Sequence, residues 1–428
     1  MKTYCLKLLL IGMIILVIAA CSNANDDHGG MDHEQNNQGN GQHDDHDSDN
    51  SEEEDSTASA EKVTAPSALN DKAEENLFVE NTKNVTRLNT TDPYEMAVMT
   101  SQTVWPSTHK DNQPGAVILA PIEDWAISLA SANLIHHPNN GPVLFINKTH
   151  VPEITKNEIE RLDPKGNMDG VEIMVMGGVN DSVIDSLEGY EVKRFQKNDP
   201  AAFAREIDQA YAKMNGEYPD TVIVGSLEEK GRMFTTPAVN WIAHMPEPLL
   251  YVSDKGVPEA TKLALQERDG KANIYLLGPE SIISKDTEEA LSEYGKVTRI
   301  SGETPVESSI AFAQFKDKAT KFGWGLTDPG HGVSFTSTAS PDLAIAGAPF
   351  AHLGKHAPMI WLDEGELNQV HYDFFKDIKP TFKDDPTNGP YNHAFLLGSQ
   401  DAVSYKIQGI IDEKLEIVQA GGEGHGGH

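Results

Sequence analysis

Short apolar runs alternate with stretches of helical spacing in the first part of this 428-residue chain. The runs span four to six residues and are rich in β-branched side chains, which is typical of strands that a sheet buries on both faces. They predict strands at residues 116–120, 143–146 and 171–176. Because strands that alternate with helices form parallel sheets with helices on their faces, the expected fold class is α/β.

The stretches next to these strands carry apolar side chains at helical intervals and predict three helices. The first, residues 122–136, has Asp124 in place to cap its amino end. The second, residues 153–162, is introduced by Pro152, a residue that a first helical turn tolerates. The third, residues 181–187, follows the last strand and its glycines.

This succession of elements occurs three times. Each copy opens with an arginine in a strand-like string and closes with a strand that ends in glycine. The opening arginines, Arg87, Arg194 and Arg299, lie 107 and 105 residues apart. This spacing is too long for a solenoid unit and suits a small domain that buries its own core. We therefore expect three modules, at residues 69–190, 191–295 and 296–418.

The chain opens with an apolar run, residues 8–20, which is too short to span a bilayer comfortably. The run closes with Ile-Ala-Ala-Cys at 18–21, which resembles a bacterial lipobox. We expect residues 1–20 to be a lipoprotein signal peptide, and Cys21 to carry the acyl chains that hold the protein in the lipid bilayer, on the outer face of the membrane. The alternative is an ordinary signal peptide with an incidental cysteine. Since Cys5 would leave with the signal, no disulfide is expected.

Residues 21–68 differ in composition from the rest of the chain. Between residues 22 and 60 there are twelve acidic residues and no Lys or Arg. Large apolar side chains are so few that ordering this segment would cost more entropy than burial could return, which predicts a disordered, His-rich tether extended by like charges. The formal net charge of −32 disfavours nucleic acid as a partner, because phosphate contacts need clustered Lys and Arg.

Histidines interleave with carboxylates in the tether and recur in a Gly/His-rich tail at residues 419–428. Such spacing suits zinc, copper or nickel, so the binding of divalent metal ions is one hypothesis. The other is a solvated polar tail, because no pair has the rigid helical spacing or the cysteines of a structural site. The residues concerned are His28, His33, His43, His46, His425 and His428. No further cofactor is expected.

Four strings of the first copy have counterparts, in the same order, in the third. They are Tyr94-Glu95-Met96-Ala97, Asp124-Trp125-Ala126, Gly141-Pro142-Val143-Leu144 and Met176-Gly177-Gly178-Val179. The second copy is degenerate in its middle, at residues 228–231. Over about residues 85–415, this order of elements resembles the bacterial cell-wall-binding repeat family (type 2).

The resemblance implies three tandem Rossmann-like or Toprim-like modules, packed with pseudo-threefold symmetry. It also implies a non-catalytic protein that binds anionic polymers of the Gram-positive wall, with peptidoglycan as the other wall partner. The sequence departs from the family at Pro93, where many members have a second arginine.

Recurrent polar and glycine residues are the candidate ligand contacts. Asp124 and Asp342 stand where they could cap helices, which is the structural alternative to a ligand role. The glycines after the last strands suit a tight turn into a helix whose free amides attract an anion. The arginines either join modules through salt bridges or contact polymer phosphates. The set is Arg87, Arg194, Arg299, Asp124, Asp342, Gly177, Gly178 and Gly398.

Motifs for catalysis are absent from the sequence. There is no Gly-x-Ser-x-Gly elbow, His-Glu-x-x-His pair or P-loop, so we expect no enzyme. The most enzyme-like string, Asp328-Pro329-Gly330-His331-Gly332, is expected to form a turn before a strand. Two alternatives stay open: a solute- or metal-binding lipoprotein of an importer, which would show two lobes about a hinge, and a wall hydrolase or its accessory factor.

An acidic protein is repelled by an acidic wall at long range. Binding to wall polymer therefore requires a locally basic surface or bridging divalent cations. A protein-interaction platform beneath the wall would avoid this repulsion.

Overall fold

A computed structural model describes residues 64–70 and 72–421 of the chain. The signal peptide, Cys21, most of the expected tether and the six tail histidines lie outside these residues. Among the residues that are described, no helix has the length and apolarity needed to cross a membrane.

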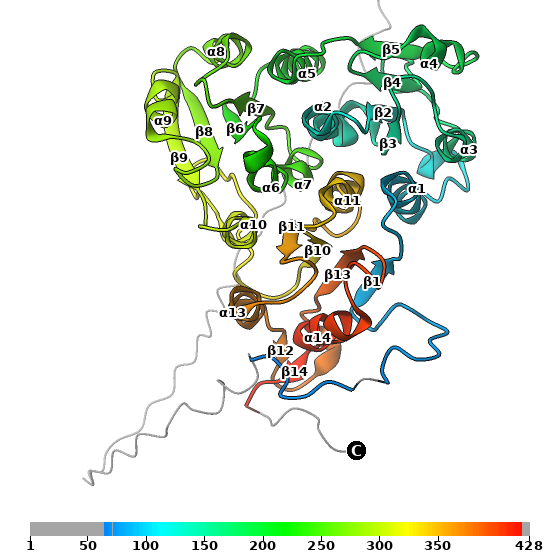
Figure 1. Cartoon of the computed structure of the whole chain (residues 1–428), viewed down its shortest axis with the longest axis vertical. Helices are drawn as coiled ribbons and strands as arrows, with labels where there is room; N and C mark the ends of the chain where they lie inside the picture. The colour runs from blue at the N-terminus through cyan, green and yellow to red at the C-terminus, as the bar shows by residue number, and fades with distance from the viewer. Residues whose placement is uncertain (1–63, 71, 422–428) are drawn as a thin grey trace, which may run out of the picture. The chain divides into compact units, whose positions relative to one another are not determined.

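Three four-stranded parallel sheets organise the fold and confirm the α/β class (Figure 1). All three have the same strand order, in which the second strand of a repeat is an inner strand. The first sheet runs β3-β2-β4-β5, the second β7-β6-β8-β9 and the third β11-β10-β13-β1. Their strands are β1 (Val85–Leu88), β2 (Val117–Pro121), β3 (Val143–Ile146), β4 (Ile173–Met176), β5 (Val192–Phe195), β6 (Thr221–Ser226), β7 (Leu249–Val252), β8 (Ala272–Leu277), β9 (Gly295–Ile300), β10 (Gly332–Ser337), β11 (Met359–Leu362) and β13 (His393–Leu397). Two further short strands, β12 (Thr381–Phe382) and β14 (Val418–Gln419), pair with each other.

Each sheet takes its last strand from the beginning of another repeat. The strands with Arg194 and Arg299, β5 and β9, pair with β4 and β8 of the preceding repeat. The third sheet is completed by β1, with Arg87, from the start of the described chain. Sheets and sequence repeats are thus offset by one strand. The expectation that each copy folds around its own strands is wrong in this respect, and the limits at 190 and 295 divide the sequence rather than the sheets.

Helices join the three sheets in a cycle. The helix after each shared strand, α1 (Pro93–Val104), α5 (Pro200–Asn215) or α10 (Pro305–Gln314), begins with a proline behind a capping Asp or Thr. Each of these helices packs on the outer strand of the next sheet, and each also contacts a helix of the sheet it has left. The same contacts therefore recur three times, as pseudo-threefold packing requires.

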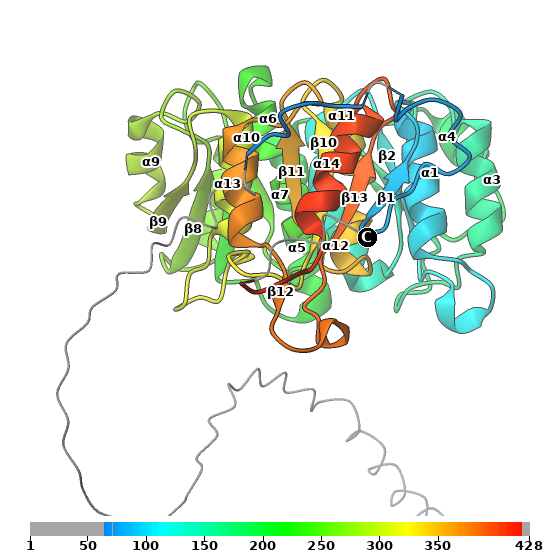
Figure 2. The same cartoon turned by 90° about the horizontal axis from the view of Figure 1, so that it is seen from below.

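The other helices cover the sheets and the junction between them. Figure 2 shows α14 beside β13 and β1, which it contacts. These helices are α2 (Trp125–Ser131), α3 (Glu153–Leu162), α4 (Asp181–Asp185), α6 (Arg232–Thr235), α7 (Ala238–Ile242), α8 (Glu259–Gln266), α9 (Lys285–Leu291), α11 (Pro341–Ala346), α12 (Pro349–His352), α13 (Gln369–Asp377) and α14 (Tyr405–Leu415).

The strands and most helices of the first repeat confirm the sequence interpretation. Strands β2, β3 and β4 are buried along their whole length, which explains their unbroken apolar runs. The helix expected at 122–136 is wrong in extent: α2 ends at Ser131 and is followed by a 3₁₀ turn and a wider turn at Ile135–Asn139. The backbone leaves regular helical geometry at Leu134 (φ −95°, ψ 0°) and again at His137, where Pro138 disfavours helical geometry in the residue before it.

Candidate functional site

Arg87 lies inside the junction between β1 and the third repeat. Its side chain is buried, and all three guanidinium nitrogens have partners. Nε donates to Gln408 Oε1 at 2.6 Å, Nη1 to the carbonyl of Gly398 at 2.9 Å and Nη2 to the carbonyl of Ser404 at 3.3 Å. Desolvation by burial lowers the pKa of Arg87 to about 10, so the guanidinium is still charged at neutral pH.

Arg299 repeats this geometry nearer the surface. Its Nη1 donates to the carbonyl of Gly278 at 2.7 Å, and Nη2 donates to the carbonyl of Ile283 at 3.0 Å. Nη2 also lies 2.7 Å from Glu288 Oε2 in an ion pair. A charged donor on a shared strand therefore binds the turn that follows the neighbouring strand.

Arg194 occupies the equivalent place with weaker contacts. Nη2 lies 3.5 Å from the carbonyl of Val179, and Nη1 lies 3.3 Å from Asp181, whose side chain is 87% exposed. The contacts show that the arginines join repeats, one of the two roles expected of them. Ligand contact by Arg87, Arg194 and Arg299 stays a prediction.

The glycines after the last strands adopt the tight turns that were expected. Gly177, Gly278 and Gly398 have φ of +72°, +116° and +145°, a region that favours glycine. Gly178 has ordinary φ, but a Cβ there would lie 2.0 Å from Asn198 Oδ1. The carbonyls of Gly278 and Gly398 face arginines. Anion binding by Gly177, Gly178 and Gly398 stays a prediction.

The two aspartates differ. Asp124 caps α2 as predicted, since its Oδ1 accepts a hydrogen bond from the amide of Ile127 at 3.4 Å. The capping prediction for Asp342 is wrong. Pro341 takes the first helical position, so Asp342 lies inside the first turn of α11 and forms an ion pair with Arg232 of the second repeat. The ligand role of both aspartates remains a prediction.

Equivalent loops meet at the carboxyl ends of the second and third strands of each repeat. In the first repeat the amide of Lys148 donates to Glu123 Oε1 at 3.2 Å, and in the second the amide of Asp254 donates to Glu228 Oε1 at 3.0 Å. In the third, the amide of Glu364 donates to Thr338 Oγ1 at 2.9 Å. The segment of the second repeat that looks degenerate in sequence therefore forms the same contact.

Sequence reasoning missed the residues that complete these junctions. Gln408 is fully buried on α14 and accepts from Arg87, while Arg232 bridges repeats through Asp342 and stacks over Trp125, with 5.6 Å from its guanidinium carbon to the ring centre. Tyr251 donates to the carbonyl of Ala126 in the first repeat at 2.6 Å. No local signal marks these residues, because each one acts through a partner more than a hundred positions away.

Two open hollows occur in the described part of the chain. One is bordered by Glu217, Tyr218 and Arg268, and the other by Asp185 and Tyr190. The Asp-Pro-Gly-His-Gly string at 328–332 bends the chain at residues 328–330, before β10, which begins with Gly332. Carboxylates and a tyrosine border both hollows, and the first also has Arg268 and Lys271.

No protein-family model and no curated protein matches the chain. Solved structures do. Cwp6 from Clostridium difficile superposes with a TM-score of 0.60 at 18% identity over 78% of this chain, and Cwp8 from the same organism gives the same three values. The chain has the fold of these proteins. It spans about half their length, 48% of Cwp6 and 52% of Cwp8.

Proposed function

We propose that this protein associates with the bacterial cell wall and binds an anionic wall polymer through its three-repeat body without catalysis. One observation carries the proposal: the chain has the fold of Cwp6 and Cwp8, which are cell wall proteins. The three sheets also agree with the repeated order that resembles the cell-wall-binding family. Three like sheets do not match the two lobes that a solute-binding lipoprotein would require.

The carboxyl ends of the strands are the favoured place for the polymer. In parallel sheets, ligands bind outside the carboxyl ends of strands, where the strand order reverses. Here that point lies between β2 and β4 in the first sheet, between β6 and β8 in the second and between β10 and β13 in the third. Four lysines stand in loops that follow strands of the first and second sheets: Lys148, Lys197, Lys230 and Lys255. The corresponding loops of the third sheet contain no Lys or Arg.

The positive charges of these lysines offset only part of the repulsion between an acidic protein and an acidic wall. Lys230 pairs with Asp254 at 3.0 Å, and Lys148 lies 4.0 Å from Asp124. Both pairs are partly exposed, so each holds its lysine weakly and a phosphate can replace the carboxylate. Divalent cations that bridge the carboxylates to the polymer are the second means of contact.

Sedimentation with isolated cell walls tests the function. We expect the full chain, purified in detergent, to sediment with Gram-positive walls and to be released as salt screens the attraction. Walls stripped of teichoic acids and other anionic polymers should retain much less. Undiminished binding to stripped walls would identify peptidoglycan as the ligand, and no binding to either would refute the proposal. A parallel assay with a chelator measures the part carried by divalent cations.

Two matched variants test the location. Replacing Lys148, Lys197, Lys230 and Lys255 with glutamine should weaken wall binding by about tenfold or more, because phosphate contacts depend on these charges. The control variant has the same change of net charge at exposed lysines outside these loops, namely Lys110, Lys165, Lys213 and Lys271. If both variants lost the same amount of wall binding, net charge would explain the binding and the position of the four loop lysines would not.

Lipid anchoring at Cys21 is part of the proposal and places the body on the outer face of the membrane. Two or three acyl chains hold a protein far more durably than one. The Cys21→Ser variant should leave the membrane fraction for the medium, and mass spectrometry of the wild-type N-terminal peptide should show the acyl mass. A wild-type peptide without that mass would reject the anchor but not the wall association.

The absence of catalysis has its own test. Release of dye from labelled peptidoglycan by the purified chain, alone and with a wall hydrolase, separates a binder from a hydrolase and from an accessory factor. We expect no release by the chain alone and no stimulation of the hydrolase.

A further inference from the structure

Three histidines, one from each repeat, meet where the repeats join. Each lies at or after the end of the helical segment that follows the second strand of its repeat: His136 follows α2, His244 follows α7, and His352 ends α12. These segments pack on one another. One ring nitrogen from each histidine lies within 4.8 Å of those of the other two. Repetition therefore brings three imidazoles together from positions more than a hundred residues apart.

Hydrogen bonds select the free nitrogen in two of the rings. His136 Nδ1 lies 2.7 Å from the backbone carbonyl of His244, so Nδ1 carries the proton and Nε2 keeps its lone pair. His352 Nε2 lies 3.0 Å from Asn140 Oδ1. The indole of Trp105 donates to the same oxygen at 3.4 Å, which supports the orientation of the amide. His352 therefore donates from Nε2 and has its lone pair on Nδ1.

The third ring holds a buried nitrogen without a partner. His244 Nδ1 is inaccessible to solvent and makes no hydrogen bond. Its Nε2 lies 3.1 Å from His356 Nδ1, which can accept the proton of Nε2. Buried polar atoms are rarely left without a partner, because desolvation costs free energy that no bond returns. A ligand for this nitrogen would remove that cost.

A histidine binds a metal ion through the ring nitrogen that carries its lone pair. In each of the three rings the second nitrogen is oriented by a carbonyl, an amide or another imidazole, as in protein metal sites.

We propose that His136, His244 and His352 bind one divalent transition-metal ion of the zinc class at the junction of the three repeats. Three imidazoles with an open fourth position for water are a known zinc arrangement. Zinc–nitrogen bonds of about 2.1 Å place tetrahedral ligands about 3.4 Å apart, so the rings close inward by about 1 Å on binding. One ion then holds all three repeats together. The site goes beyond the proposed function and does not depend on wall binding.

Metal binding by the tails must be separated from this site. The test uses the full chain in detergent, with asparagine in place of His28, His33, His43, His46, His425 and His428. Chelator treatment and dialysis first remove bound metal. When zinc is then added to a micromolar free concentration, we expect this chain to bind one zinc ion and its melting temperature to rise. With cobalt, it should show the strong visible absorption of a four-coordinate ion.

Single ligand variants carry the decision. His244→Asn and His136→Asn should each weaken zinc binding by a hundredfold or more, since even residues that merely orient a ligand contribute about ten- to a hundredfold. The exposed His109→Asn is the matched control and should bind zinc as the parent does. Melting curves in chelator identify any variant that fails to fold, and the second ligand variant then decides.

Two results would overturn the site. One is a tail-substituted chain that folds and binds no zinc, which would leave the rings as packing, with His136 stacked on His137 at 4.2 Å between ring centres. The other is zinc binding that persists in both ligand variants. Neither result bears on the sedimentation of the chain with cell walls.

Discussion

The same strand exchange occurs at three places, and two of them differ sharply from the third. At the internal junctions, β5 joins β4 and β9 joins β8, with paired residues 19 and 23 positions apart. At the closing junction, β1 joins β13, and Val85 pairs with Ala394, 309 positions away. Loop closure over this longer span costs about 2 kcal/mol more. The closing junction therefore needs contacts that the internal ones can do without.

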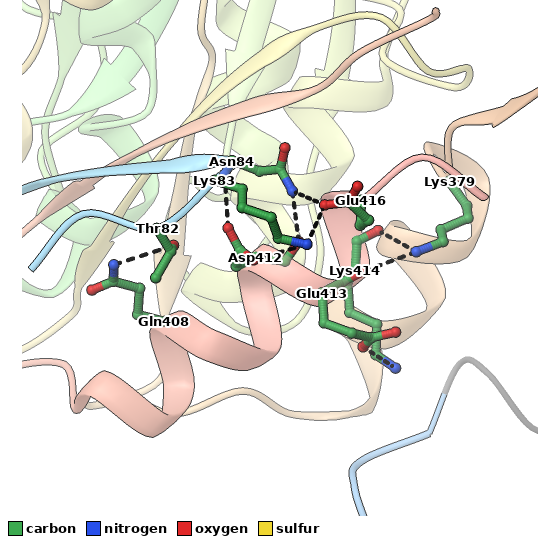
Figure 3. A network of polar contacts seen from close by, with 9 residues as sticks. All are labelled: Thr82, Lys83, Asn84, Lys379, Gln408, Asp412, Glu413, Lys414 and Glu416. Carbon is green, nitrogen blue, oxygen red and sulfur yellow. Dashed lines mark hydrogen bonds and ion pairs between the residues drawn. The ribbon is translucent and has the colours of Figure 1, made fainter. Parts of the chain in front are cut away.

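Polar contacts at the closing junction supply that difference (Figure 3). The amide of Asn84 donates to Asp412 Oδ1 at 2.7 Å, and Gln408 Nε2 donates to the carbonyl of Glu80 at 2.7 Å. Lys83 forms an ion pair with Glu416. All these partners come from α14 or the turn after it. The segment before β1 is thus held along its length by the C-terminal helix.

The burial and the contacts of the three arginines also differ between the junctions. Arg87 at the closing junction is enclosed, Arg299 is partly exposed, and Arg194 has the longest contacts and the most exposed partner. The sequence pattern around the three is alike, so the difference comes from what each junction must hold. Four tests examine this comparison.

Removal of residues 64–91 should have the largest effect. Without β1, the third sheet loses the buried side chains of Val85 and Leu88 and the contacts of Arg87, together roughly 6 kcal/mol of stability. Hydrogen exchange should become fast in β10 and β13 while β2 and β6 stay protected. Deletion of residues 22–63 is the control and should change neither. Uniform protection after loss of β1 would mean that the closing junction carries little stability.

The arginine series comes next. Arg87→Met should lower the free energy of unfolding by about 3 kcal/mol, because two buried acceptors and one partly buried acceptor lose a charged donor. Arg299→Met should cost about 1 to 2 kcal/mol and Arg194→Met less than about 1 kcal/mol, since their partners are partly solvated. Denaturant unfolding measures all three. Equal costs would show that the three junctions are energetically equivalent.

Acid should loosen the closing junction through His393. This residue of β13 lies 3.0 Å from Thr86 Oγ1, and its pKa is lowered to about 4 by burial and then by the charge of Lys355. In the unfolded chain this histidine binds a proton near pH 6.5, whereas in the folded chain it stays neutral until about pH 4. Between these values protonation favours the unfolded chain, so the free energy of unfolding falls by on the order of 2 kcal/mol as pH falls from 6.5 towards 4 and is unaffected by His393 above pH 6.5.

Melting curves from pH 7 to 4.5 measure this effect. His393→Asn should flatten the pH dependence, and exchange of the β1 amides should follow it. The exposed His109→Asn is the control. An unchanged slope in His393→Asn would assign the acid response to other groups.

Lys83→Gln should have the smallest effect. The Lys83 side chain is 66% exposed, so its ion pair with Glu416 should contribute no more than about 1 kcal/mol, and high salt should remove it. Unfolding in low and high salt gives the measurement. If Lys83→Gln lowered the free energy of unfolding as much as Arg87→Met, the surface ion pairs would stabilise the closing junction as strongly as the buried guanidinium does.

Local pattern was enough for the elements of the first repeat. The unbroken apolar runs of β2 and β3 reflect burial on both faces, and the α3 bounds follow from its apolar spacing. Asp124 was correctly predicted as a cap because its helix start has a usual pattern. Asp342 was not, because a proline beside it moves the helix start by two residues, to Ser340 as the cap.

The candidate sites show the limit more clearly. The arginines were found by repetition, yet the sequence left open whether they face a polymer or another repeat. The histidines of the junction were missed because each one stands alone in its own segment. The tail histidines attracted the metal hypothesis because they are close together in sequence. Proximity in the chain is a poor guide when a site is built from three repeats.

The sequence by itself determined the α/β class, the three repeats and the strands that a sheet would bury, because side-chain burial and helix starts leave local patterns. Only the tertiary structure decided which sheet each shared strand completes, how deeply Arg87 lies and where three histidines meet. The physical reason is that these features depend on contacts between segments a hundred to three hundred residues apart. Because the three arginine strands have nearly the same local pattern, that pattern cannot specify that β1 pairs with β13, about three hundred residues away.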